Sequence, residues 1–267
     1  MDRVVLIKGG GDIGTAVAVR LHKASMQVVV TERPGNPILR RAMSFGAAID
    51  QGEVEVHGVR ARPSATKAET RTLLANQVIP VWTAGWAAAL DALSPKILID
   101  ARMMKREQNT ETRKDHAPLI IGLGPGFTAG QDVHLVIETN HGPNLGRIIK
   151  EGAAEPYTGI ARVIQGYGLE RYVYAPIDGT FLTTREIGAR VETDEVLGRI
   201  GKEELRSRFP GIVRGILKSG TAVRKGQKLV DIDPRGEEIV TRTFTDRAMR
   251  IAEAVLLAIE DWERSQG

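Results

Sequence analysis

The chain has 267 residues, of which 42% are hydrophobic, and this suits one large domain or two small ones; we expect two. The absence of cysteine excludes disulfides, thiolate metal sites and any mechanism that needs a cysteine nucleophile or persulfide on this chain. The formal charge of +4 and the 4% aromatic content argue against a nucleic-acid partner.

The first hundred residues alternate between strand and helix patterns. We expect strands over 3–7, 27–32, 53–59, 78–82 and 96–100, and helices over 13–24, 36–49, 64–77 and 85–93. This alternation predicts an α/β fold with a doubly wound, Rossmann-like sheet. The start of the chain lacks a secretory signal and no stretch is long enough to span a membrane, so we expect no membrane partner and a cytoplasmic location.

The motif "KGGGDIG" lies where the first strand turns into the first helix, and it matches G-x-G-x-x-G. In a Rossmann unit such glycines let the backbone approach a pyrophosphate, and an acidic residue after the second strand contacts a ribose. The predicted cofactor-binding residues here are Gly9, Gly10, Gly11, Asp12, Ile13, Gly14 and Glu32. The alternative is a structural strand-to-helix turn that binds nothing.

Asp12 is unusual inside such a motif, because its carboxylate would repel a phosphate. It either caps the helix or carries a proton or a metal. Asp12 is therefore one candidate catalytic residue, although no catalytic residue and no metal site is assigned.

A second glycine loop, "GLGPGFTAG", follows a further strand pattern near residue 120. Glycines at a strand end can form an anion-binding nest, although they are also common in plain turns. With the preceding strand end "IDAR", this adds the candidate binding residues Asp100, Arg102, Gly122, Gly124, Gly126, Phe127 and Thr128. Arg102, Lys105 and Arg106 could close on phosphates or form an exposed basic loop.

Asp132 and His134 are the other two candidate catalytic residues. Their spacing places both on one face of a strand, if the strand begins that early. A structural hydrogen bond is the alternative explanation for this pair.

Beyond residue 170 the pattern changes to short strands with a 32-residue internal repeat that aligns Gly179 with Gly211 and Leu197 with Leu229. The repeat resembles the barrel-sandwich fold of biotinyl and lipoyl domains. We expect a Rossmann-like domain over 1–168, a small all-β domain over 169–236, and a C-terminal helix over 237–267 that packs back on the first domain.

Several motifs together resemble the YqeB family, described as selenium-dependent molybdenum hydroxylase system proteins: "GGGDIGTAVAVRL", "IDARMMKR", "IGLGPGFTAGQDVHLVIET", "LGRIIKEG" and "DIDPRG". Its N-terminal part looks like the Rossmann domain of XdhC-type maturation factors. "SFGAAIDQG", over 44–52, departs from the family pattern.

The resemblance implies an accessory or maturation protein that binds a molybdopterin-type cofactor or nucleotide at the glycine loops. Its partners would be a molybdenum hydroxylase apoenzyme and a protein that supplies the chalcogen. The alternatives are an NAD(P)-dependent oxidoreductase and a non-catalytic adaptor, and the oligomeric state stays open.

Overall fold

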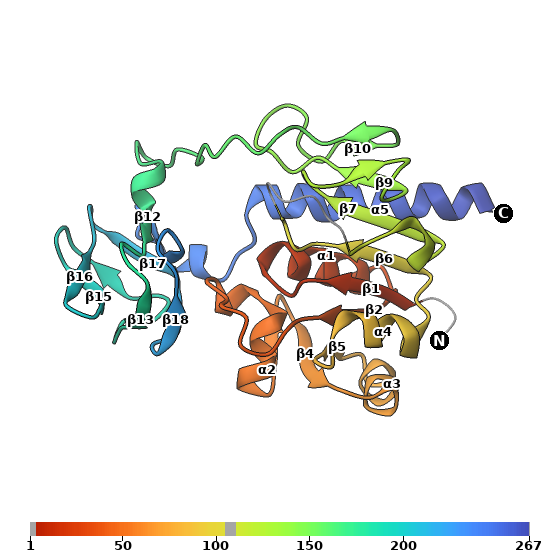
Figure 1. The fold of residues 1–267 in the computed structure, drawn as a ribbon, viewed down its shortest axis with the longest axis horizontal. Coiled ribbons are helices and arrows are strands. Elements are labelled where there is room, and N and C mark those ends of the chain that lie inside the picture. Colours follow the sequence, from red (N-terminus) through yellow and green to blue (C-terminus); the bar gives the residue numbers. More distant parts are fainter. Residues whose placement is uncertain (1–3, 105–110, 267) are drawn as a thin grey trace. The chain divides into compact units, whose positions relative to one another are not determined.

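The computed structural model describes residues 4–104 and 111–266, which form two compact units (Figure 1). The larger unit comprises Met1–Pro34, Ser44–Thr158 and Phe244–Gly267, and the smaller comprises Gly35–Met43 and Gly159–Thr243. Each has its own apolar core. Two separate segments of the chain therefore build the smaller unit, and the pattern of the sequence did not predict that Gly35–Met43 belongs to it.

A nine-stranded mixed sheet forms the centre of the larger unit, in the order β10-β9-β7-β6-β1-β2-β5-β4-β3. Its strands are β1 (Val4–Lys8), β2 (Gln27–Thr31), β3 (Val54–Val56), β4 (Val59–Ser64), β5 (Ile79–Trp82), β6 (Ile97–Asp100), β7 (Leu119–Leu123), β9 (Leu135–Ile137) and β10 (Ile148–Ile149). The inner strands pair in parallel, whereas β3 and β10 pair antiparallel to their neighbours. Two short strands, β8 (Thr128–Ala129) and β11 (Gly152–Ala153), pair apart from this sheet.

The helices of the larger unit are α1 (Asp12–Lys23), α2 (Ala48–Gln51), α3 (Lys67–Ala75), α4 (Trp86–Leu93) and α5 (Asp246–Gln266). Helix α5 buries one stripe that includes Ile251, Val255 and Ile259, and it packs against α1. Helix α3 begins after Thr66, whose hydroxyl accepts from the amide of Glu69 in a capping box.

The helix predicted over 36–49 is wrong. Its backbone groups bond to distant partners instead: the Leu39 carbonyl accepts from Ile216, and the amides of Phe45 and Gly46 donate to Thr15 and Gly10. Because these backbone groups bond outside the segment, they are not available for the hydrogen bonds of one continuous helix. Only short helical turns form, at Arg41–Met43, Phe45–Ala47 and Ala48–Gln51.

The smaller unit is built from the 32-residue repeat. The first copy supplies β13 (Gly179–Leu182), β14 (Arg190–Val191) and β15 (Val196–Ile200), and the second supplies β17 (Gly211–Ile216), β18 (Thr221–Val223) and β19 (Lys228–Asp233). The middle strands are exchanged: β14 pairs with β17, and β18 pairs with β13. With β12 (Tyr172–Tyr174) and β16 (Glu203–Arg206), the copies give two four-stranded antiparallel sheets.

The expected fold class, a doubly wound Rossmann-like sheet plus a barrel-sandwich domain, is therefore wrong as stated. The large sheet is mixed, and β5 rather than β3 lies beside β2. Among the described residues, no α-helix lies in the connection from β6 to β7 or in that from β7 to β9. The smaller unit contains two separate antiparallel sheets rather than one closed barrel.

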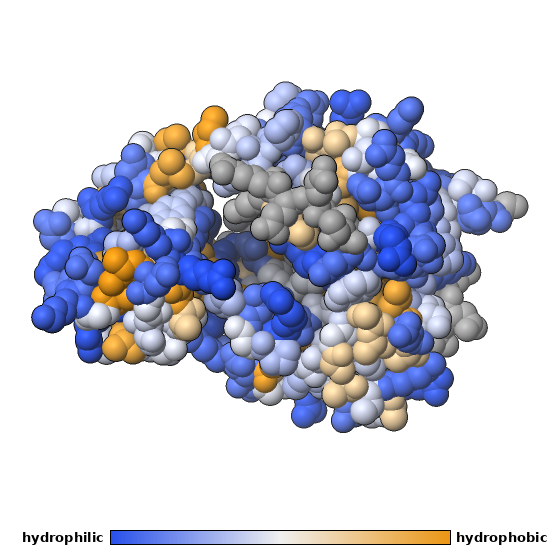
Figure 2. All heavy atoms as spheres, in the orientation of Figure 1, coloured by the Kyte–Doolittle hydropathy of each residue, from blue (hydrophilic) through white to orange (hydrophobic). Residues whose placement is uncertain are grey.

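Several exposed apolar side chains lie near the start of the segment Gly159–Thr243 of the smaller unit. Ile160, Val163 and Leu169 are all exposed. Figure 2 shows that most of the surface in this view is hydrophilic, with a few separate groups of orange, hydrophobic atoms.

Candidate functional site: a charged cluster at the carboxyl edge of the sheet

Strand register aligns the carboxyl ends of the inner strands. Lys8 at the end of β1 is in register with Asp100 at the end of β6, and Asp100 is in register with Gly122 of β7. The glycine turn, the "IDAR" segment and the second glycine loop therefore follow neighbouring strands at one edge. Ligands of open α/β sheets bind at this edge.

Lys8, Asp100 and Arg102 form a charged cluster with Glu111 and Thr112. Arg102 donates hydrogen bonds to both carboxylate oxygens of Asp100, from Nε to Oδ1 at 3.0 Å and from Nη2 to Oδ2 at 2.8 Å. Lys8 Nζ is 3.9 Å from Asp100 Oδ2, and Thr112 Oγ1 donates to that same oxygen at 2.7 Å. The Asp100 carboxylate is thus fully partnered by groups from three segments.

A single oxygen of Glu111 joins both cations. Lys8 Nζ donates to Glu111 Oε2 at 3.0 Å, and Arg102 Nη1 donates to the same atom at 2.9 Å. The side chains of Asp100 and Lys8 are 0% and 4% exposed, whereas that of Glu111 is 54% exposed. Two cations anchored on the sheet, Lys8 and Arg102, therefore donate to the same carboxylate oxygen of an exposed side chain.

The surroundings of Lys8 are partly apolar. Its Nζ lies 3.5 Å from the ring centroid of Trp86, at the start of α4. Burial lowers the pKa of Lys8, although Asp100 opposes that effect. The hydrogen bond from Lys8 in turn holds the pKa of Glu111 below its usual value, so Glu111 is ionised at neutral pH.

The first glycine turn is largely filled by protein groups. The Gly10 amide donates to Glu32 Oε2 at 2.9 Å, and the Gly10 carbonyl accepts from Gly46. A Cβ on Gly14 would lie 2.0 Å from the Gly9 carbonyl oxygen. Of the four glycines in the turn, which are Gly9, Gly10, Gly11 and Gly14, only Gly11 has open space where a Cβ would point.

Asp12 and Ile13 are the first two residues of α1, directly after the glycine turn. Asp12 Oδ1 accepts from the Ile13 amide in the first turn of α1, and the Ile13 side chain is buried. Asp12 does not cap α1, because the N-cap residue is Gly11 and no side chain caps the helix there.

The second glycine loop also packs on itself. Phe127 is buried against Gly122, where a Cβ would come within 2.4 Å of its ring. Gly124 and Gly126 have φ values of +81° and +102°, which favour glycine, and Thr139 fills the space beside Gly124. The Thr128 amide donates to Asp132 Oδ2 at 2.9 Å, so Asp132 closes the loop.

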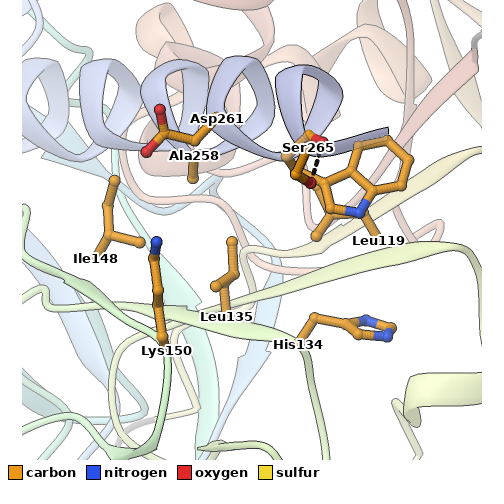
Figure 3. Close-up of a pocket in the computed structure, with 9 residues that line it drawn as sticks. Leu119, His134, Leu135, Ile148, Lys150, Ala258, Asp261 and Ser265 are labelled. Carbon is orange, nitrogen blue, oxygen red and sulfur yellow. Dashed lines mark hydrogen bonds between the residues drawn. The ribbon is translucent and has the colours of Figure 1, made fainter. Parts of the chain in front are cut away.

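His134 lies apart from the charged cluster. The Ile120 amide donates to its Nδ1 at 3.0 Å, which fixes the ring, and burial lowers its pKa. It lines a pocket of about 220 Å³ with Leu135, Ile148 and Lys150 on one side, and Ala258 and Asp261 of α5 on the other (Figure 3). This pocket is mainly apolar and contains none of the predicted cofactor-binding residues.

Of this cluster, Asp100 and Arg102 were predicted from the sequence, whereas Lys8 and Glu111 were not. Lys8 carried a signal, because it is a charged residue at the end of an apolar strand, directly before the glycine turn. Glu111 lies in a charge-rich loop and carried none. Lys105 and Arg106, which the sequence placed beside Arg102, lie outside the described residues.

The "DIDPRG" motif belongs to the smaller unit and has a structural explanation there. Buried Asp231 accepts from Arg171 and Arg214, and Asp233 accepts from Arg235 at 2.9 and 2.7 Å. Burial raises the pKa of Asp233, but the hydrogen bonds from Arg235 outweigh burial and bring it below the ordinary value. Each of these two carboxylates thus has a cationic partner that offsets the cost of its burial.

Two properties are absent from the described part of the chain. Across residues 4–104 and 111–266, no three His, Asp or Glu side chains gather closely enough to hold a metal ion. No helix in the same ranges has the length and apolar character needed to cross a bilayer.

No protein-family model matches the chain. A curated protein of Escherichia coli (strain K12), described as uncharacterized protein YqeB, is 40% identical over 257 residues. The chain is a relative of YqeB. The match covers 96% of this chain but 47% of YqeB, so the chain spans about half the length of that relative. The resemblance to the YqeB family is thereby supported, while the description of YqeB assigns no activity.

Two solved structures show a distant likeness to the chain. The ectoine utilization protein EutE (DoeB) from Ruegeria pomeroyi matches with a TM-score of 0.27 and 14% identity, covering 86% of this chain and 85% of that one. An aspartoacylase family protein from Mesorhizobium loti matches with a TM-score of 0.27 and 10% identity, covering 87% and 85%. Likeness at this level assigns neither a fold nor an activity to the relative of YqeB described here.

The predicted maturation of molybdenum hydroxylases is wrong, and so are selenium dependence and a molybdopterin-type, nucleotide or NAD(P) cofactor. The descriptions of YqeB and of the solved structures named above mention no molybdenum cofactor, selenium or NAD(P). The glycine turn agrees with this correction, because Glu32 and Gly46 already bond to Gly10 where a pyrophosphate would need the backbone. The two alternatives, an NAD(P)-dependent oxidoreductase and an adaptor, gain no support.

Proposed function

We propose that the chain binds a small anionic molecule at the carboxyl edge of the large sheet, through Lys8 and Arg102. The observation that carries the proposal is the single surface oxygen position to which both cations donate, at 3.0 and 2.9 Å. Charge-assisted hydrogen bonds from two anchored donors are a strong and specific way to hold an oxyanion. The cytoplasm remains the predicted compartment.

The anchoring of the two cations supports binding rather than a loose surface ion pair. Asp100 is fully buried and accepts hydrogen bonds from both Nε and Nη2 of Arg102, so the guanidinium keeps its orientation whatever occupies the neighbouring position. A preorganised donor loses little side-chain entropy when a ligand binds.

Thermal unfolding in the presence of propionate, succinate or inorganic phosphate, at constant ionic strength, tests this proposal. A ligand that binds only the folded state at 100 times its Kd stabilises that state by about 2.7 kcal/mol, so the midpoint should rise with concentration. Arg102→Ala should abolish the rise. Arg20→Ala is the matched control, because Arg20 pairs with Glu253 on the surface of α1 and α5. An equal response of both variants, or no response of the wild-type protein to any probe, would refute the proposal.

A further inference from the structure

We infer that the Glu111 carboxylate is an internal occupant of the anion position, and that a ligand carboxylate binds by replacing it. This inference rests on the proposed function. It names the ligand's binding group as a carboxylate and identifies Glu111 as the residue that regulates access.

The first argument is geometric. Glu111 Oε2 is the atom to which Lys8 Nζ and Arg102 Nη1 both donate, so it occupies the place that the ligand oxygen would need. A ligand and Glu111 cannot both hold that place. Glu111 therefore competes with any anion that the two cations bind.

The second argument concerns what holds Glu111. Its neighbour Thr112 is buried, and the Thr112 hydroxyl donates to Asp100 and lies 3.4 Å from Lys8 Nζ. The backbone is thus fixed beside the cluster, while the half-exposed Glu111 side chain reaches the two cations from solvent. Rotation of that side chain into water removes it from the anion position without moving the sheet.

The third argument concerns what remains after Glu111 leaves. Arg102 keeps its hydrogen bonds to Asp100, and Lys8 keeps its contacts with Asp100, Thr112 and the ring of Trp86. The charges of Lys8, Arg102 and Asp100 then add to +1. One carboxylate neutralises this charge, whereas a phosphate would bring about −1.5 to −2 at neutral pH. A carboxylate is therefore the better match.

The size of the effect follows from the competition. If Glu111 occupies the position in about nine of ten molecules, the apparent affinity is about ten-fold weaker than that of the open site. Removal of the Glu111 carboxylate should therefore raise the apparent affinity for the ligand about ten-fold.

Propionate, which has the length of a glutamate side chain, is the probe. Its binding is measured by NMR titration, with the indole N–H signal of Trp86 as reporter, because that ring lies beside Lys8. We expect Glu111→Ala to bind propionate about ten-fold more tightly than the wild-type protein, with a smaller gain for inorganic phosphate. Glu111→Gln, which keeps the side-chain size, is the second variant if Glu111→Ala does not fold.

Asp115→Asn is the matched control. It removes one negative charge four residues further along the chain, where Asp115 pairs with Arg113 and contacts neither cation of the cluster. Equal propionate affinity in Glu111→Ala and wild-type protein would overturn the inference while the proposed function stands. An equal gain in Asp115→Asn would also overturn it, as a general charge effect. Absence of binding in every variant would refute both.

Discussion

At the scale of residues, Asp100 and Glu111 have different tasks although both are carboxylates of one cluster. Asp100 is buried and positions Lys8 and Arg102, whereas Glu111 is half exposed and contacts the same cations from the surface. Burial decides how costly the loss of each is, because a buried cation without its partner is strongly unfavourable. Exposed ion pairs contribute little.

Asp100→Ala should therefore lower the free energy of unfolding by about 3–5 kcal/mol, since it leaves Lys8 without its buried partner. Glu111→Ala should lower it by less than about 1 kcal/mol. Urea denaturation followed by circular dichroism compares the two. Equal losses would mean that Glu111 is a structural member of the cluster, contrary to our account.

The pH dependence of stability reports on Glu111 separately. The hydrogen bond from Lys8 lowers the pKa of Glu111 in the folded state, so its stabilising contribution is present above the ordinary pKa of 4.5 and is lost as the pH falls through the folded value. The difference in stability between wild-type protein and Glu111→Gln should shrink below about pH 4.5. A difference that stays constant down to pH 3 would contradict this assignment.

At the scale of elements, the first glycine turn shows what a motif alone predicts. Its spacing correctly indicated a strand that turns directly into a helix, because β1 ends at Lys8 and α1 begins at Asp12. It could not reveal that Gly46, 36 residues after Gly10, packs on the turn and bonds to its carbonyl. That contact depends on tertiary structure, which also overrode the helical spacing of residues 36–49.

The glycines of this turn should respond very differently to one added methyl group. Gly14→Ala should lower the free energy of unfolding by about 1–3 kcal/mol or more, because the new Cβ would lie 2.0 Å from the Gly9 carbonyl oxygen. Gly11→Ala should change it by less than about 0.5 kcal/mol, since nothing lies within 4 Å of its Cβ position. Thermal denaturation of both variants decides this, and a Gly11→Ala protein as unstable as Gly14→Ala would show that the turn is closed there as well.

At the scale of the whole molecule, the two units have separate cores, and the sequence indicated the smaller one through its repeat. Gly179 and Gly211 begin β13 and β17, as the 32-residue offset predicts. The exchange of β14 and β18 between the copies was not predictable, because a repeat fixes which residues are equivalent and not which strands pair. The strand order of the large sheet was not predictable either, because the order of strands along the chain does not determine which strands pair.

All three tryptophans, Trp82, Trp86 and Trp262, belong to the larger unit, whereas Phe181 is in the core of the smaller one. Phe181→Ala should destabilise the smaller unit by about 3–5 kcal/mol. We expect the far-ultraviolet circular dichroism transition to shift while the tryptophan fluorescence transition stays in place. Coincident shifts of both signals would show that the two units unfold as one.

The central claim is that Lys8 and Arg102 hold an anion at the carboxyl edge of the sheet, and a crystal structure of Glu111→Ala with propionate tests it most directly. The account predicts a propionate oxygen within hydrogen-bond distance of Lys8 Nζ and Arg102 Nη1, where Glu111 Oε2 lies in the wild-type protein. Water at that position in crystals saturated with propionate would contradict the account.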